Sequence, residues 1–203
     1  MKVGFIVECG PEGAETKVIP MLAKAINAKI EPDVVPLDKK PKLKTECGKW
    51  AKKLIEGGCV KVVIIWDLLP DWGEYDGKGC RHEDRNEIFA SLAEAGFKVN
   101  DKRIKFVCIE KMLESWIIAD ERALSHFLST PAHKVGVKRQ KSPENIPDPK
   151  AALIDLFRKS KSHFNRYVDY VHAFPIAQRA VGFGLPARLG KLETFNRFRA
   201  SLA

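Results

Sequence analysis

The stretch Val62-Val63-Ile64-Ile65-Trp66-Asp67 is a run of β-branched and aromatic residues that ends in a carboxylate. Two more stretches are built in a similar way, Val3-Gly4-Phe5-Ile6-Val7-Glu8 and Phe106-Val107-Cys108-Ile109-Glu110. Short apolar runs followed by polar, glycine and proline residues are typical of buried strands. Because segments with helical character separate the three runs, we expect parallel strands in one sheet with helices on both faces.

The order of elements along the chain predicts an α/β fold with an appended helical part. We expect strands at 2–8, 33–37, 60–66 and 103–109, and helices near 14–28, 44–56, 84–95, 111–128, 149–159, 163–181 and 191–202. A loop over 67–83 and a Pro-, Ser- and Lys-rich connector over 131–149 interrupt them, and Pro175 should kink or split its helix. The prediction is an open, mainly parallel sheet flanked by helices over residues 1–130, with a basic helical extension over residues 131–203 packed on it.

Length and composition narrow the class of protein. At 203 residues the chain is long enough to bury a sizeable core. No apolar stretch approaches the roughly 20 residues of a membrane span, and the N-terminal run turns acidic at Glu8, too early for a signal peptide. The five cysteines form no C-x-x-C pair and are odd in number. These features favour a cytoplasmic protein.

The positive charge is concentrated in the last third of the chain. Residues 134–203 carry 14 Lys and Arg against 5 Asp and Glu, whereas residues 1–133 carry 21 of each kind. A basic part beside an acidic site suits a polyanionic substrate such as DNA or RNA. We expect the cluster of Lys138, Arg139 and Lys141 to bind nucleic acid, the alternative being a basic surface that only keeps the protein soluble or docks an acidic partner protein.

The acids that end the strands predict a metal site. Parallel strands expose their carboxyl ends along one edge of the sheet, where several acids repel one another unless a cation lies among them. The candidate ligands are the strand-end and loop acids Glu8, Asp67, Asp71 and Glu114. Oxygen ligands favour Mg²⁺ or Mn²⁺, and Cys80-x-His82 lacks the partners that zinc needs. The alternative is that each acid caps or solvates a helix, and for Glu15, in the first turn of a helix, we favour that role.

Two acids four residues apart follow the fourth strand. Glu110 and Glu114 would share one face of the helix expected at 111–128. Such a pair can ligate a metal, although a solvated surface pair is the commoner arrangement. Glu114 is our candidate because it lies close to Trp116, at the edge of the sheet.

Several segments together resemble a known family. They are Val7-Glu8-Cys9-Gly10 with Glu15, Glu114-Ser115-Trp116-Ile117-Ile118-Ala119-Asp120, Pro143-Glu144-Asn145-Ile146-Pro147-Asp148-Pro149-Lys150, Tyr170-Val171-His172-Ala173-Phe174-Pro175-Ile176-Ala177 and Thr194-Phe195-Asn196-Arg197-Phe198. The chain resembles the Toprim domain of topoisomerases, primases and OLD-type nucleases. More narrowly, it resembles an uncharacterised family of Toprim-like, OLD-nuclease-related proteins, and the resemblance spans nearly the whole chain.

The resemblance implies a catalytic role for two of the acids. Glu8 would act as a general acid/base or metal ligand, and Asp67 would bind Mg²⁺. A Toprim enzyme normally has Asp-x-Asp after the third strand, which would require an acid at position 69, where this chain has Leu69. Asp71 is the substitute we expect. This departure puts catalysis in question more than it does the Toprim-like fold.

The leading hypothesis is a metal-dependent nuclease or phosphoryl-transfer enzyme that acts on nucleic acid. Two Mg²⁺ ions held by the acids would activate water and stabilise the leaving oxygen. The resemblance also implies that the protein could work with an ATPase partner in a defence system. One alternative is a non-catalytic Toprim-like subunit that binds nucleic acid or a partner. Another is a small-molecule enzyme, which would be favoured if the acidic edge were roofed into a closed pocket.

Overall fold

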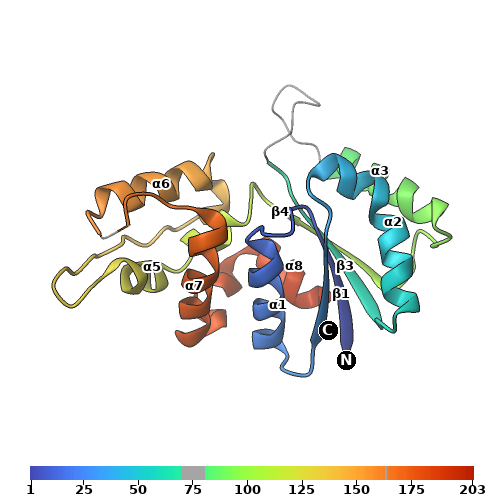
Figure 1. Ribbon diagram of the computed structural model, residues 1–203, viewed down its shortest axis with the longest axis horizontal. Helices are drawn as coiled ribbons and strands as arrows, with labels where there is room; N and C mark the ends of the chain where they lie inside the picture. The colour runs from blue at the N-terminus through green and yellow to red at the C-terminus, as the bar shows by residue number, and fades with distance from the viewer. Residues whose placement is uncertain (70–80, 163) are drawn as a thin grey trace.

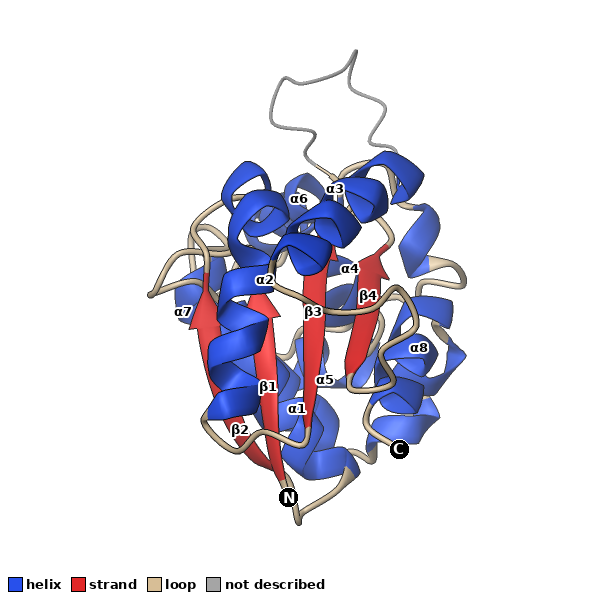
Figure 2. Cartoon of the chain, turned by 90° about the vertical axis from the view of Figure 1, so that its right-hand side faces the viewer, coloured by secondary structure: helices blue, strands red, loops and turns tan. Residues whose placement is uncertain are grey.

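In the computed structural model, which describes residues 1–69, 81–162 and 164–203, four parallel strands form one open sheet. They are β1 (Lys2–Val7), β2 (Glu31–Pro36), β3 (Lys61–Asp67) and β4 (Ile104–Ile109), in the order β2-β1-β3-β4. All four arrows in Figure 2 point the same way, so the carboxyl ends of the strands share one edge. This confirms the predicted α/β class with a mainly parallel open sheet, and it is consistent with a Toprim-like fold.

Helices cover both faces of the sheet. The helices are α1 (Glu15–Ile26), α2 (Lys40–Glu56), α3 (Arg81–Glu94), α4 (Glu114–Ile118), α5 (Glu121–Leu128), α6 (Pro149–Lys159), α7 (Asp169–Gly182) and α8 (Glu193–Ser201). In Figure 1, α2 and α3 lie on one side of the strands, while α1 and α8 lie on the other. Helices α5, α6 and α7 extend that second side away from the sheet, and α7 packs on both α1 and α5.

The two faces of the sheet support two separate hydrophobic clusters. Along β3, Val63 and Ile65 point into the larger cluster, whereas Val62 and Ile64 point into the smaller one beneath α2 and α3. This alternation is the period-two pattern of a strand with both faces buried. The larger cluster reaches from β1 to the C-terminal helices, so the basic extension and the α/β part share one core.

The expected helix 111–128 is wrong as a single element. The chain after β4 first turns at Lys111, whose φ of 69° is left-handed, and α4 begins only at Glu114. A second break follows because the Asp120 side chain accepts hydrogen bonds from the N–H groups of Arg122 and Ala123. An Asp that caps a helix competes with continuation of the preceding one.

Prolines change other boundaries less than expected. Pro175 lies inside α7, which remains one continuous helix and is not split. That helix begins at Asp169 and not near 163. Helix α2 begins at Lys40, four residues earlier than the expected start at 44. Pro41 occupies a first-turn position of this helix, where its missing N–H is not needed. Within the described residues no helix is both long and apolar enough to cross a bilayer.

Candidate functional site

Glu8 and Asp67 meet at the carboxyl edge of the sheet. They follow or end the adjacent strands β1 and β3, and the Oε2 atom of Glu8 accepts a hydrogen bond of 3.1 Å from the Asp67 main-chain N–H. The Asp67 carboxylate in turn accepts a hydrogen bond of 3.3 Å from the N–H of Leu113, just before α4. These two hydrogen bonds therefore fix both acids at the carboxyl edge of the sheet, as the sequence predicts.

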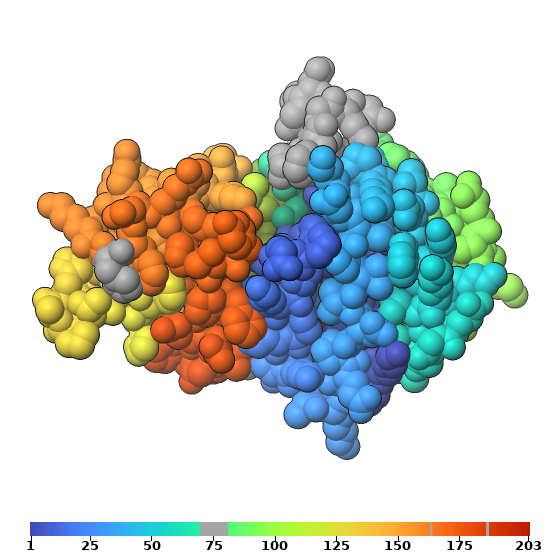
Figure 3. All heavy atoms as spheres, viewed as in Figure 1, coloured from blue at the N-terminus to red at the C-terminus, as the bar shows by residue number. Residues whose placement is uncertain are grey.

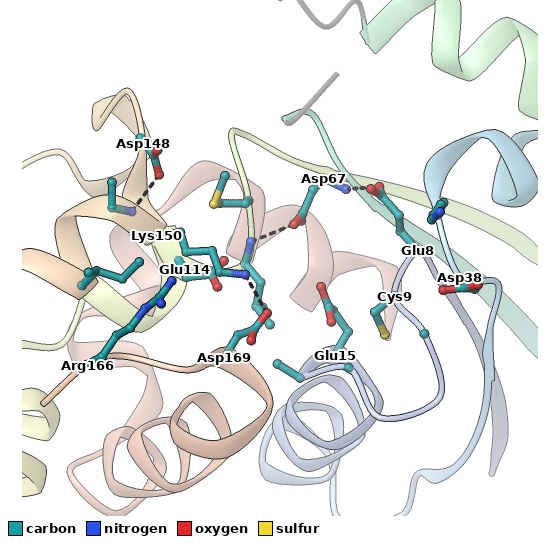
Figure 4. A pocket seen from close by; sticks show the side chains of 18 residues that line it. Glu8, Cys9, Glu15, Asp38, Asp67, Glu114, Asp148, Lys150, Arg166 and Asp169 are labelled. Atoms are coloured by element: carbon teal, nitrogen blue, oxygen red, sulfur yellow. Dashed lines mark hydrogen bonds and ion pairs between the residues drawn. The ribbon is translucent and has the colours of Figure 1, made fainter. Parts of the chain in front are cut away.

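The two acids line a cavity of about 640 Å³. Figure 4 shows Glu8, Cys9 and Glu15 on one side of it, and in Figure 3 the cavity lies between the atoms of the β1–α1 region and those of α6 and α7. Glu114 lines the same cavity and is only 6 % exposed. Glu8, Asp67 and Glu114, three of the four predicted metal ligands, thus line one cavity.

Burial and mutual repulsion raise the pKa values of Asp67 and Glu114. The pKa of Asp67 lies well above its usual range because protein surrounds its carboxyl, with further contributions from the charges of Glu15, Glu8 and Glu114. Although the Asp67 residue keeps some surface facing the cavity, the environment of its carboxyl is that of the interior. Burial also raises the pKa of Glu114 to about 7, against the opposing charge of Lys150. The cavity is a place where positive charge is favoured.

Glu15 lies in the first turn of α1, where we expected it, and it also lines the cavity. Burial raises the pKa of its carboxyl, which lies on the same side of the cavity as the Cys9 thiol. The connection from β1 to α1 brings Cys9 and Glu15 together because it makes a tight turn, in which the Gly13 N–H donates to the Gly10 carbonyl at 2.9 Å. A Cβ at Gly13 would lie 2.3 Å from the Cβ of Cys9, so the turn requires glycine there.

Basic residues from the extension face the acids. Lys150, at the start of α6, lines the cavity and forms an ion pair of 2.8 Å with Asp169, at the start of α7. Arg166 also lines the cavity and is exposed. Figure 4 shows Lys150, Arg166 and Asp169 across the cavity from Glu8 and Glu15. The cavity therefore combines carboxylates from the sheet edge with cations from the basic part of the chain.

The backbone beside the acids is strained. Asp38 and Lys39 have φ values of 54° and 128°, in the region that favours glycine. Their N–H groups donate to the carbonyls of Cys9 at 2.9 Å and of Glu8 at 2.6 Å, respectively. Strain of this kind gathers at functional sites, where the surrounding structure has to maintain it.

The donor chemistry of the cavity fits Mg²⁺. Its candidate ligands are carboxylate oxygens, and Mg²⁺ is commonly held by one or two protein carboxylates while it keeps several waters. Glu8 and Asp67 would hold it. In the parts of the chain that the structure describes, no three His, Cys, Asp or Glu side chains converge closely enough to form a complete protein cage.

Comparisons with protein-family models, curated proteins and solved structures found no match to this chain. The functional argument therefore rests on the residues and on their arrangement.

Other predicted site residues lie elsewhere. Glu110 precedes α4, so it does not share a helix face with Glu114, and its side chain approaches Arg81 at 3.9 Å outside the cavity. Asp71 lies outside the described residues. The three basic residues predicted to bind nucleic acid, Lys138, Arg139 and Lys141, are exposed, and none of them lines the cavity.

Sequence reasoning assigned no role to several residues of the cavity. The sequence could have indicated Lys150 as a site residue, because it ends the Pro-Glu-x-Ile-x-Asp-Pro-Lys segment that carries the family resemblance. Asp169 and Arg166 carry no local signal, since their place depends on how the extension folds back over the sheet edge. Cys9 follows a candidate acid directly, yet only the turn geometry places it on the same side of the cavity as Glu15.

Proposed function

We propose that this protein is a Mg²⁺-dependent nuclease or phosphoryl-transfer enzyme that acts on nucleic acid. The observation that carries the proposal is the hydrogen-bonded pair of Glu8 and Asp67 at the ends of two central strands, in a cavity with cations on its opposite side. Open α/β folds bind their ligands at this edge. Carboxylates for a metal and cations for phosphate are the two kinds of group that phosphoryl transfer requires.

Each group of the cavity has a role in this proposal. A bound Mg²⁺ would supply positive charge where the phosphoryl oxygens become more negative. Glu8 and Asp67 would hold the ion, and Lys150 with Arg166 would bind the phosphate from the opposite wall. Glu114 has a pKa of about 7, so its carboxyl can take up or release a proton near neutral pH.

Cleavage of labelled nucleic acid tests the proposal. We expect the wild-type chain to cut single-stranded DNA or RNA in Mg²⁺ or Mn²⁺ but not in EDTA. Glu8→Gln and Asp67→Asn should each lower the rate by at least about a hundredfold, the scale of a lost transition-state contact. Glu110→Gln is the matched control, because Glu110 also ends a strand but lies outside the cavity, and it should retain activity. Equal rates in all four proteins would refute the assignment.

A second candidate function is a non-catalytic subunit that binds nucleic acid or a protein partner. Leu69 occupies the position where a Toprim enzyme has its second Asp, and the described residues form no three-ligand metal cage. Such a subunit would still bind nucleic acid through its basic extension. It would show no Mg²⁺-dependent stabilisation, which separates it from the enzyme.

A further inference from the structure

Two of the acids that line the cavity are nearly buried, whereas Asp67 and Glu15 are half-buried. Glu8 is 8 % exposed and Glu114 is 6 % exposed, so neither carboxylate stands on an outer surface that a double helix could lie against. A cavity of about 640 Å³ has the size that encloses one small ligand. Enzymes that act on a base from within such a pocket take single strands or draw one nucleotide out of the duplex.

One side of the cavity is suited to a phosphate. Arg166 makes no hydrogen bond or ion pair with any part of the chain that the structure describes, although it lines the cavity. Lys150 lies on the same wall. Such an arginine presents its planar fork of N–H groups to a ligand, and phosphate matches that fork with two parallel hydrogen bonds.

The same cavity also offers an apolar surface. Met112 and Leu113 line it next to Glu114, and Ala151 with Ile154 lines it beside Lys150. A nucleotide has one strongly anionic part and one flat, largely apolar part, the base. The cavity therefore provides a complementary surface for both parts of a single unpaired nucleotide.

We infer that this cavity takes one unpaired nucleotide of a single strand or a strand end, with its phosphate against Arg166, and that it excludes intact duplex. The inference names the substrate class of the proposed function and rests on it for the site, but binding can be measured without cleavage. The exposed cluster of Lys138, Arg139 and Lys141, outside the cavity, would add binding that does not distinguish single strands from duplex.

Binding of a short fluorescent oligothymidylate, measured by anisotropy in EDTA and in Ca²⁺ at about 0.15 M salt, tests the inference. Arg166→Glu should weaken this binding at least about tenfold, because a hydrogen bond to a charged group is lost and repulsion replaces it. The matched control is Arg158→Glu, the same charge change at an exposed position on α6 that does not line the cavity. It should change binding less than about twofold. A duplex should bind the Arg166→Glu and Arg158→Glu variants equally well.

The outcomes separate this inference from the proposed function. Equal single-strand binding by the two variants, or an equal loss of single-strand and duplex binding in Arg166→Glu, would overturn the inference. So would binding of thymidine monophosphate but not of the oligonucleotide, which would indicate a small-molecule enzyme. Arg166-dependent single-strand binding without any Mg²⁺-dependent cleavage would support the inference and refute the nuclease. If the protein cut closed circular duplex as fast as single strands, and this cutting depended on Glu8, the nuclease would be supported and the inference refuted.

Discussion

The carboxylate of Glu8 accepts a hydrogen bond of 3.1 Å from the main-chain N–H of Asp67, so the first acid of the cluster is fixed to the strand that carries the second. The bond joins residues that are far apart in the sequence and places both carboxyl groups at the same point of the sheet edge. It also brings together two negative charges whose repulsion contributes to the raised pKa of Asp67.

A divalent cation should stabilise the folded protein through this pair. Mg²⁺ or Mn²⁺ at ten times its Kd should add about 1.4 kcal/mol to the free energy of unfolding, because it binds only the native state. Glu8→Gln should remove most of that increment while leaving the fold intact. Thermal melting with and without metal measures it, with Glu110→Gln as a control that keeps the response. The same metal response in Glu8→Gln as in the wild type would contradict Glu8 as a ligand.

The Glu114 carboxyl should make stability fall as the pH rises toward neutrality. Its pKa is about 7 in the folded chain against an ordinary value of 4.5. The folded state therefore holds a proton that the unfolded state has lost between these values. The contribution is complete below about pH 4.5 and is lost as the pH passes 7, and its size is at most about 3 kcal/mol.

Urea unfolding at several pH values between 4 and 8 tests the Glu114 prediction. Glu114→Gln should flatten the decline in that range, because the amide does not titrate. Some decline should remain in the variant, since Asp67 and Glu15 also have raised pKa values. An unchanged slope in Glu114→Gln would show that this carboxyl titrates normally.

A buried lysine should hold the chain on both sides of Asp67. The Nζ atom of Lys40 donates to the Leu68 carbonyl at 2.9 Å and lies 3.7 Å from Asp84, which accepts a hydrogen bond from the Trp66 indole. Lys40→Met should therefore speed amide exchange at residues 67–69 beyond the change in global stability, which we expect to be about 2 kcal/mol.

Lys44→Met is the matched control for Lys40→Met. The Lys44 side chain is equally buried and also lies 3.7 Å from Asp84. Among the described residues, however, its hydrogen bond of 2.9 Å goes to Glu87, whereas that of Lys40 goes to the Leu68 carbonyl. Lys44→Met should lower the global stability, and amide exchange at residues 67–69 should speed up only as much as that global change predicts. Identical amide-exchange patterns in the two variants would mean that Lys40 has no local effect on the end of β3, which carries Asp67.

Gly48 should be intolerant of alanine because α2 and α3 approach each other closely there. A Cβ at this position would lie 2.0 Å from the Ser91 carbonyl oxygen, which is main chain and cannot rotate away. Although alanine normally favours a helix over glycine by about 1 kcal/mol, Gly48→Ala should destabilise the protein by roughly 1–3 kcal/mol or more. Gly136→Ala, with no atom within 4 Å of the new Cβ, should be nearly neutral in the same denaturant titration.

The exposed basic cluster should bind nucleic acid without regard to sequence. Changing Lys138, Arg139 and Lys141 together to Glu should weaken filter binding at low salt for every sequence about equally, since phosphate contacts carry no base information. The slope of log K against log salt should shrink by about 2 to 3. A triple reversal of the exposed Lys49, Lys52 and Lys53 on α2 controls for net charge. Equal effects of the two triples would leave the basic stretch with only a general role in charge or solubility.

The sequence by itself determined the sheet and the place of its acids. The continuous apolar run from Val62 to Ile65 and similar runs required strands buried on both faces, and parallel strands necessarily bring Glu8 and Asp67 to one edge. The continuous helix expected after Glu110 failed because local capping by Asp120 and the turn at Lys111 outweigh helical periodicity. Such competition depends on single side-chain contacts, which a pattern does not contain.

Only the tertiary structure decided which charges face one another. Glu15 joins the acids because the turn from β1 folds its side chain toward the cavity, and Lys150 and Arg166 reach it because α6 and the start of α7 pack beside the sheet edge. These residues come from distant parts of the chain. Their proximity is set by the packing of the larger hydrophobic cluster, whose members reach from β1 to the C-terminal helix. Local sequence specifies each element, whereas the shared core specifies the distances between their side chains.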